Sequence, residues 1–206
     1  MSFDMDIPKN VLDYLSETAS LIGKIQRDEF AGDTSESLSD VSSSPIEQIL
    51  YTAFCFLRKT WGCNDYIEDI ENNDKWIEEA LSIYPQFRVG QYKVDFMVVG
   101  TAVGEYHRII VECDGHEFHD RDENQRRHEK QRDRYLQRKG YKVFHFTGSE
   151  IVNNPYKIAC EVFAEALGIR PGLLADSFIS YLSNEKQIKE LNDFCAQFPA
   201  SYSKGL

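Results

Sequence analysis

Three carboxylates occupy positions in apolar segments where they could hold a metal ion. Asp95 lies within KVDFMVV, where a buried charge is costly unless a partner compensates it. Glu112 and Asp114 are two residues apart in IIVECDG, so on a strand they share one face while Cys113 points to the other. If the two segments pair, the carboxylates converge, and oxygen ligands of this kind suit Mg²⁺ or Mn²⁺. Alternatively, Asp95 caps a turn and Glu112 to Gly115 is an ordinary strand exit.

Two histidines follow the second carboxylate pair directly. His116 and His119 stand in GHEFH, close along the chain to Asp114, and a histidine can act as a general base near neutral pH. We therefore treat both as candidate catalytic residues.

A basic segment follows the histidines. Residues 121–142 hold nine Lys or Arg and four Asp or Glu, a local excess of positive charge in a chain of net charge −11. The spacing of Arg127, Lys130, Arg134 and Arg138 predicts one stripe along a helix, which could contact successive phosphates of a nucleic acid. A solvated helix face with internal ion pairs is the alternative.

The elements that would position these residues follow in the order αβββαβα, which predicts a mixed α/β fold. Ser44, Pro45 and Glu47 resemble a capping box and start a helix over 45–59. The other expected elements are strands at 85–89 and 92–99 that turn at Gly90-Gln91, a strand at 107–115, a helix at 120–139, a strand at 141–146 and a helix at 155–167.

This pattern resembles a known group of nucleases. Asp95, Glu112-x-Asp114-Gly115, and the later run from Gln131 through Gly140 to Phe146 resemble the Vsr-like (very short patch repair-like) endonuclease domains of the PD-(D/E)XK, or restriction-endonuclease-like, superfamily. The resemblance covers about residues 45–167.

The resemblance implies a metal site built from Asp95, Glu112 and the backbone carbonyl of Cys113, with Asp114 as a further candidate. It also implies that Glu47 on the first helix can face the metal, although the capping-box interpretation explains that residue nearly as well. The superfamily usually has Lys where this chain has Asp114, and a lysine would offset charge on the phosphate. His116, His119 and Lys130 are the candidates to replace that lysine.

Composition limits the classes of protein that remain. The chain has 206 residues, with 34 acids against 23 Lys and Arg, which argues against a protein that coats nucleic acid by bulk attraction. No long apolar run or secretory signal is visible, and the five cysteines are odd in number without a CxxC pair. These features predict a cytoplasmic protein with reduced thiols and no membrane partner. The expected cofactor, Mg²⁺ or Mn²⁺, follows instead from the carboxylates and the family resemblance.

The ends of the chain are expected to be appendages. Residues 1–30 carry an amphipathic helix over 8–30, residues 31–44 read as a Ser- and acid-rich linker, and residues 168–206 form a helical extension with helices near 171–183 and 185–196. The apolar stripe of the N-terminal helix would pack on the C-terminal helices of the same chain or form a homodimer.

Taken together, these features predict a metal-dependent endonuclease that hydrolyses phosphodiester bonds in nucleic acid, with DNA as the expected substrate. The alternative is a nuclease-fold module without catalysis that binds nucleic acid or a protein partner; Asp114 in place of Lys and the net negative charge favour it.

Overall fold

The computed structural model describes residues 9–11, 13, 38, 44–61, 81–102, 105–115, 123–182 and 184–198. None of the helices within these ranges is both long and apolar enough to cross a membrane.

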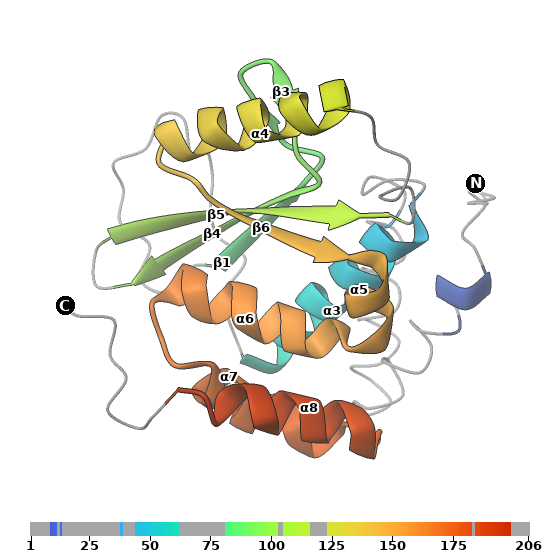
Figure 1. Ribbon diagram of the computed structural model, residues 1–206. Coiled ribbons are helices and arrows are strands. Elements are labelled where there is room, and N and C mark those ends of the chain that lie inside the picture. Colours follow the sequence, from blue (N-terminus) through green and yellow to red (C-terminus); the bar gives the residue numbers. More distant parts are fainter. Residues whose placement is uncertain are drawn as a thin grey trace, which may run out of the picture.

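A mixed sheet of four strands forms the centre of the fold (Figure 1). In spatial order its strands are β1 (Leu81–Pro85), β4 (Phe96–Ala102), β5 (Glu105–Asp114) and β6 (Lys142–Thr147). The first three are antiparallel to their neighbours, whereas β6 runs parallel to β5. A parallel pair needs a crossover connection, and helix α4 (Glu123–Arg138) supplies it. The predicted mixed α/β fold is therefore confirmed.

Helices cover both faces of the sheet. Helix α4 lies on one face, and α3 (Pro45–Trp61) and α6 (Pro155–Leu167) lie on the other (Figure 1). Aromatic side chains fill the core between these helices and the sheet. The Phe54 ring stacks on Phe163, with ring centroids 5.2 Å apart, and makes a T-shaped contact with Phe96, with centroids 5.6 Å apart. As expected from the sequence, Asn154 caps the start of α6. The helix ends at Leu167, and Gly168, in the left-handed conformation, caps its C-terminus.

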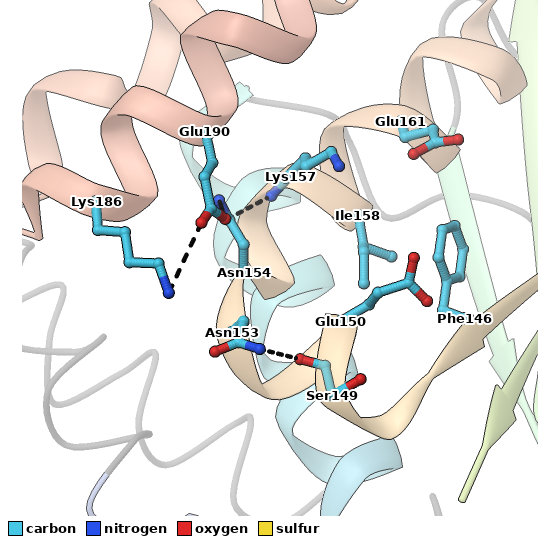
Figure 2. A pocket seen from close by; sticks show the side chains of 10 residues that line it. All are labelled: Phe146, Ser149, Glu150, Asn153, Asn154, Lys157, Ile158, Glu161, Lys186 and Glu190. Carbon is cyan, nitrogen blue, oxygen red and sulfur yellow. Dashed lines mark hydrogen bonds and ion pairs between the residues drawn. The ribbon is translucent and has the colours of Figure 1, made fainter.

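A further layer of helices packs on the outer side of α6 (Figure 1). It consists of α7 (Pro171–Phe178), the 3₁₀ turn η2 (Ile179–Tyr181) and α8 (Glu185–Cys195). The short helix α5 (Gly148–Asn153) connects β6 to α6. A polar cleft of about 250 Å³ lies where α5, α6 and α8 meet. Figure 2 shows Glu190 of α8 facing Asn154, the N-cap of α6, with Lys186 of α8 on its other side. None of the site residues predicted from the sequence lines this cleft.

The hairpin before the acidic strand differs from the expectation. Instead of two continuous strands, it has an outer ladder of β1 and β4 and a small tip of β2 (Arg88–Val89) and β3 (Tyr92–Lys93), which turns at Gly90-Gln91 as predicted. The chain bends at Gln86, whose φ is 54°.

The bend places the hairpin tip against α4. Val89 and Val94 of the tip form a second apolar cluster with Ile110 and Leu136. The rings of Tyr92 and of Tyr135 on α4 are also in contact, with their centroids 5.3 Å apart. Burial of these side chains gives a physical reason for the interrupted strands.

The predicted N-terminal helix and linker lie largely outside the described residues. Val11 and Leu38, which are described, are both fully buried and belong to the main core cluster of the chain. The domain boundaries and the homodimer remain predictions. The four described cysteines are free, as expected.

Candidate active site

Asp95, just before β4, and Glu112 of β5 lie next to each other in the sheet. Phe96 of β4 pairs with Val111 of β5, so Asp95, which directly precedes β4, stands opposite Glu112. The Asp95 carboxylate also bonds to the neighbouring strand, because its Oδ2 accepts a hydrogen bond of 2.7 Å from the backbone N–H of Cys113. The strand pairing on which the predicted convergence of carboxylates depended is present.

The side chains of β5 alternate as the sequence predicted. Glu112 contacts Arg132 of α4, and Asp114 contacts His145 on the adjacent strand β6. Cys113 instead packs against the main core on the opposite face. The end of β5 therefore presents two carboxylates toward α4.

The positively charged Arg132 contacts Glu112, the most buried of these carboxylates. Its Nη2 donates to Glu112 Oε1 at 2.6 Å and to the backbone oxygen of Lys93 at 2.6 Å. Glu112 is only 4% exposed. Burial, followed by the negative charge of Asp95, raises the pKa of Glu112 to about 8 even though Arg132 opposes the shift. Burial and the charge of Asp95 therefore disfavour ionisation of Glu112 more than Arg132 favours it.

The other carboxylates share this electrostatic environment. Burial raises the pKa of Asp95, and the Cys113 N–H and the Arg132 charge oppose the rise. The pKa of the Cys113 thiol is raised by burial first, and then by the negative charges of Asp95, Glu47, Glu112 and Asp114. All four carboxylates are therefore near one thiol at the end of β5.

Glu47 reaches this region from the first turn of α3. It is 9% exposed, and its Oε2 accepts a hydrogen bond of 2.7 Å from Gln86 Nε2, at the bend of the hairpin. The contact joins residues 39 positions apart, so local helix-capping signals could not have predicted it.

His145 has a role that the sequence pattern did not indicate. Its Nδ1 lies 3.3 Å from Asp114 Oδ2 and its Nε2 lies 3.3 Å from Asp133 Oδ1. This imidazole is partly exposed and bridges the end of β5 to α4. The predicted catalytic histidines His116 and His119 lie outside the described residues.

The basic stripe on α4 does not point at the carboxylates. Arg127, Lys130, Arg134 and Arg138 are all exposed. Arg127, Arg134 and Arg138 fall on the side of α4 opposite the buried Leu136, which faces the sheet. Arg132 precedes Leu136 by four residues, one helical turn, and so faces the site.

The described residues contain no group of three or more His, Cys, Asp or Glu side chains already arranged to hold a metal ion. The donor chemistry nevertheless fits Mg²⁺ or Mn²⁺, because Asp95, Glu112 and Asp114 supply carboxylate oxygens around the end of β5. Asp95 and Glu112 each use one oxygen in the hydrogen bonds within the described region, which leaves each a second oxygen for another ligand.

Comparison with known proteins gives one match. Residues 73–166 match the family model REase_MTES_1575, which represents a restriction-endonuclease-like family. Searches of curated proteins and of solved structures gave no match. The matched region includes β1 to β6 and α4, and therefore Asp95, Glu112 and Asp114. The match supports a restriction-endonuclease-like domain over this part of the chain, without assigning the Vsr-like subtype.

Proposed function

We propose that the chain is a metal-dependent endonuclease of the Vsr-like type that hydrolyses phosphodiester bonds in nucleic acid, with DNA as the expected substrate. The observation that carries the proposal is the position of Asp95, just before β4, opposite Glu112 of the paired strand β5, within the region that matches a restriction-endonuclease-like family. The family match points to a nuclease, and the carboxylates supply a place for its chemistry.

Asp95 and Glu112 would hold Mg²⁺ or Mn²⁺, together with the Cys113 carbonyl and Asp114. A divalent cation in such a site supplies an activated water and offsets charge on the phosphate. Asp114 cannot provide positive charge where related nucleases have lysine. Arg132 and His145 bring positive charge or a proton to this cluster, since they contact Glu112 and Asp114 respectively.

Nucleic acid would contact the outer face of α4. Its exposed cations Arg127, Lys130, Arg134 and Arg138 carry this part of the proposal. Since most of these side chains point away from the carboxylates, we expect them to position the substrate backbone at a distance from the reacting phosphate.

The test is cleavage of duplex DNA, single-stranded DNA and RNA by the full chain with Mg²⁺, Mn²⁺ or EDTA. We expect metal-dependent cleavage that falls to the EDTA level in Asp95→Asn and Glu112→Gln. Glu105→Gln is a matched control, because Glu105 lies at the other end of β5 with a side chain that is 83% exposed. Wild-type cleavage by both site variants would show that the assigned site is wrong.

A second candidate function is a nuclease-fold module that binds nucleic acid without cutting it. The ion pair between Arg132 and Glu112 favours this alternative, because it already occupies one oxygen of the carboxylate. Such a module would bind nucleic acid equally well in EDTA and in Mg²⁺, cleave none of the substrates, and keep its affinity in Glu112→Gln.

A further inference from the structure

The tip of the hairpin, formed by β2 and β3, has two chemically different faces. The two strands pair antiparallel, with Arg88 opposite Lys93 and Val89 opposite Tyr92. Residues opposite each other in such a pair share a face, and successive residues alternate between faces. Val89 and Tyr92 face α4, because Val89 belongs to the second apolar cluster and the Tyr92 ring contacts Tyr135. Arg88 and Lys93, both exposed, therefore share the face that points away from α4.

Exposed cations of α4 lie beside the tip. Gly90 at the turn packs on Tyr135 of α4, since a Cβ at Gly90 would collide with the Tyr135 hydroxyl. The Nζ of Lys139 lies 5.9 Å from the centre of the same ring. Arg134 and Arg138 of α4 are also exposed. Figure 1 shows the tip and α4 together on the side of the sheet away from α6.

The tip and the C-terminal part of α4 differ in charge from the chain as a whole. Residues 86–94 and 134–139 together hold five Lys or Arg and no Asp or Glu, whereas the whole chain has a net charge of −11. A local concentration of cations on an acidic protein attracts a polyanion to that place and not to the rest of the surface.

The tip is also joined to the candidate active site. Arg132 Nη2 donates both to the backbone oxygen of Lys93 on β3 and to Glu112 Oε1 on β5. Asp95 follows the tip after a single residue, Val94. A polyanion bound at the tip therefore lies next to the carboxylates.

The shape and the aromatic residues of the tip favour a duplex over a single strand. Proteins that bind single strands stack the bases on available aromatic rings. Here the rings of Phe87, Tyr92, Tyr135 and Tyr141 pack against the second apolar cluster or against one another, so the free face of the tip carries charge and no ring. A two-stranded ribbon fits the major groove of B-DNA, where an arginine can bind guanine through two hydrogen bonds.

We propose that the free face of the hairpin tip docks in the major groove of duplex DNA, with Arg88 at a base edge and with Lys93 and the exposed cations of α4 on the flanking phosphates. The inference rests on the proposed function, because it takes nucleic acid as the substrate. It names duplex DNA as the substrate class and the tip as the element that recognises it.

The experiment is a fluorescence-anisotropy titration of the full chain, in EDTA, into a labelled duplex and into each of its single strands. We expect wild type to bind the duplex more tightly than either strand. Replacing Arg88→Gln and Lys93→Gln together should weaken duplex binding by about tenfold or more and lower the salt dependence of affinity. Both side chains are exposed, so the melting temperature should not change.

The matched control removes the same charge on the other side of the molecule. Lys186→Gln and Lys189→Gln together neutralise two exposed cations of α8, which packs on α6 and so lies beyond the opposite face of the sheet. This control should bind the duplex like wild type. An equal loss of affinity in both double variants, or equal affinity of wild type for duplex and single strands, would overturn the inference in favour of bulk attraction.

A modified duplex tests the groove. Glucosylated 5-hydroxymethylcytosine places bulky sugars in the major groove and leaves the phosphates in place. We expect wild type to bind this duplex more weakly than the unmodified one, and the Arg88→Gln, Lys93→Gln variant to distinguish the two duplexes less. Equal binding of both duplexes by wild type would show that the tip does not enter the major groove.

The outcomes separate this inference from the proposed function. If wild type cleaves DNA with a metal, Asp95→Asn does not, and the tip variant binds duplex like wild type, the inference about the tip is wrong while the proposed function stands. If wild type binds duplex through the tip but cleaves no substrate, the tip is confirmed and the proposed catalysis is wrong. If wild type neither binds nor cleaves nucleic acid, both are wrong.

Discussion

Replacing Glu112 by Gln should remove part of the pH dependence of stability in the metal-free protein. Glu112 is 4% exposed and its pKa in the folded state is about 8, against an ordinary value of 4.5. Between these two pH values the folded state holds a proton that the unfolded chain has released. The free energy of unfolding therefore decreases as pH rises through this window.

The size of the effect follows from the same values. A pKa raised from 4.5 to about 8 corresponds to about 5 kcal/mol once Glu112 is fully ionised near pH 9, as an upper limit. About 2–3 kcal/mol of this develops between pH 5 and pH 7. Gln has nearly the shape of a protonated Glu and can still accept from Arg132, so Glu112→Gln should lack this loss.

Urea unfolding in EDTA from pH 5 to pH 9 measures the difference. We expect the wild type and Glu112→Gln to have similar stability at pH 5, and the variant to be more stable by several kcal/mol at pH 9. Glu105→Gln, on the exposed end of the same strand, should follow the wild type at every pH. Parallel curves for wild type and Glu112→Gln would refute the reasoning, because Glu112 would then ionise alike in both states.

Further expectations concern packing. Leu38→Ala should lower the free energy of unfolding by about 2–5 kcal/mol in urea titrations, because Leu38 is fully buried in the main core; a change below 1 kcal/mol would contradict that burial. Gly100→Ala should lower the free energy of unfolding by about 1–3 kcal/mol, because a Cβ at this position would lie 2.4 Å from the backbone oxygen of Ala166. Gly115→Ala, where a Cβ meets nothing within 4 Å, is its control, and equal stability of the two variants would show that β4 and α6 are not in close contact.

The adjacency of Asp95 and Glu112 could be predicted because it follows from strand alternation and chain order. Side chains two apart on a strand share a face, which places Glu112 and Asp114 together. Their convergence with Asp95 was expected if the two strands were neighbours, and β4 does pair with β5. Helix α5 could also have been predicted, since Thr147 and Glu150 have capping-box spacing and make both of its hydrogen bonds.

The partners of the carboxylates could not be predicted in this way. The contacts of Glu112 with Arg132, of Asp114 with His145 and of Glu47 with Gln86 join residues 20, 31 and 39 positions apart. The periodicity of a sequence cannot predict such a contact, because the contact depends on how α3, α4 and the hairpin pack on the sheet. The bend at Gln86 has the same origin, since glutamine has no preference for the left-handed conformation.

The central claim is that Asp95 and Glu112 together hold a divalent cation. Calorimetric titration of Mg²⁺ into wild type, Asp95→Asn and Glu105→Gln at pH 8 tests it most directly. The account predicts binding at millimolar concentration or tighter in wild type and Glu105→Gln, and its loss in Asp95→Asn. Equal Mg²⁺ binding by Asp95→Asn and wild type, or no binding by either, would contradict it.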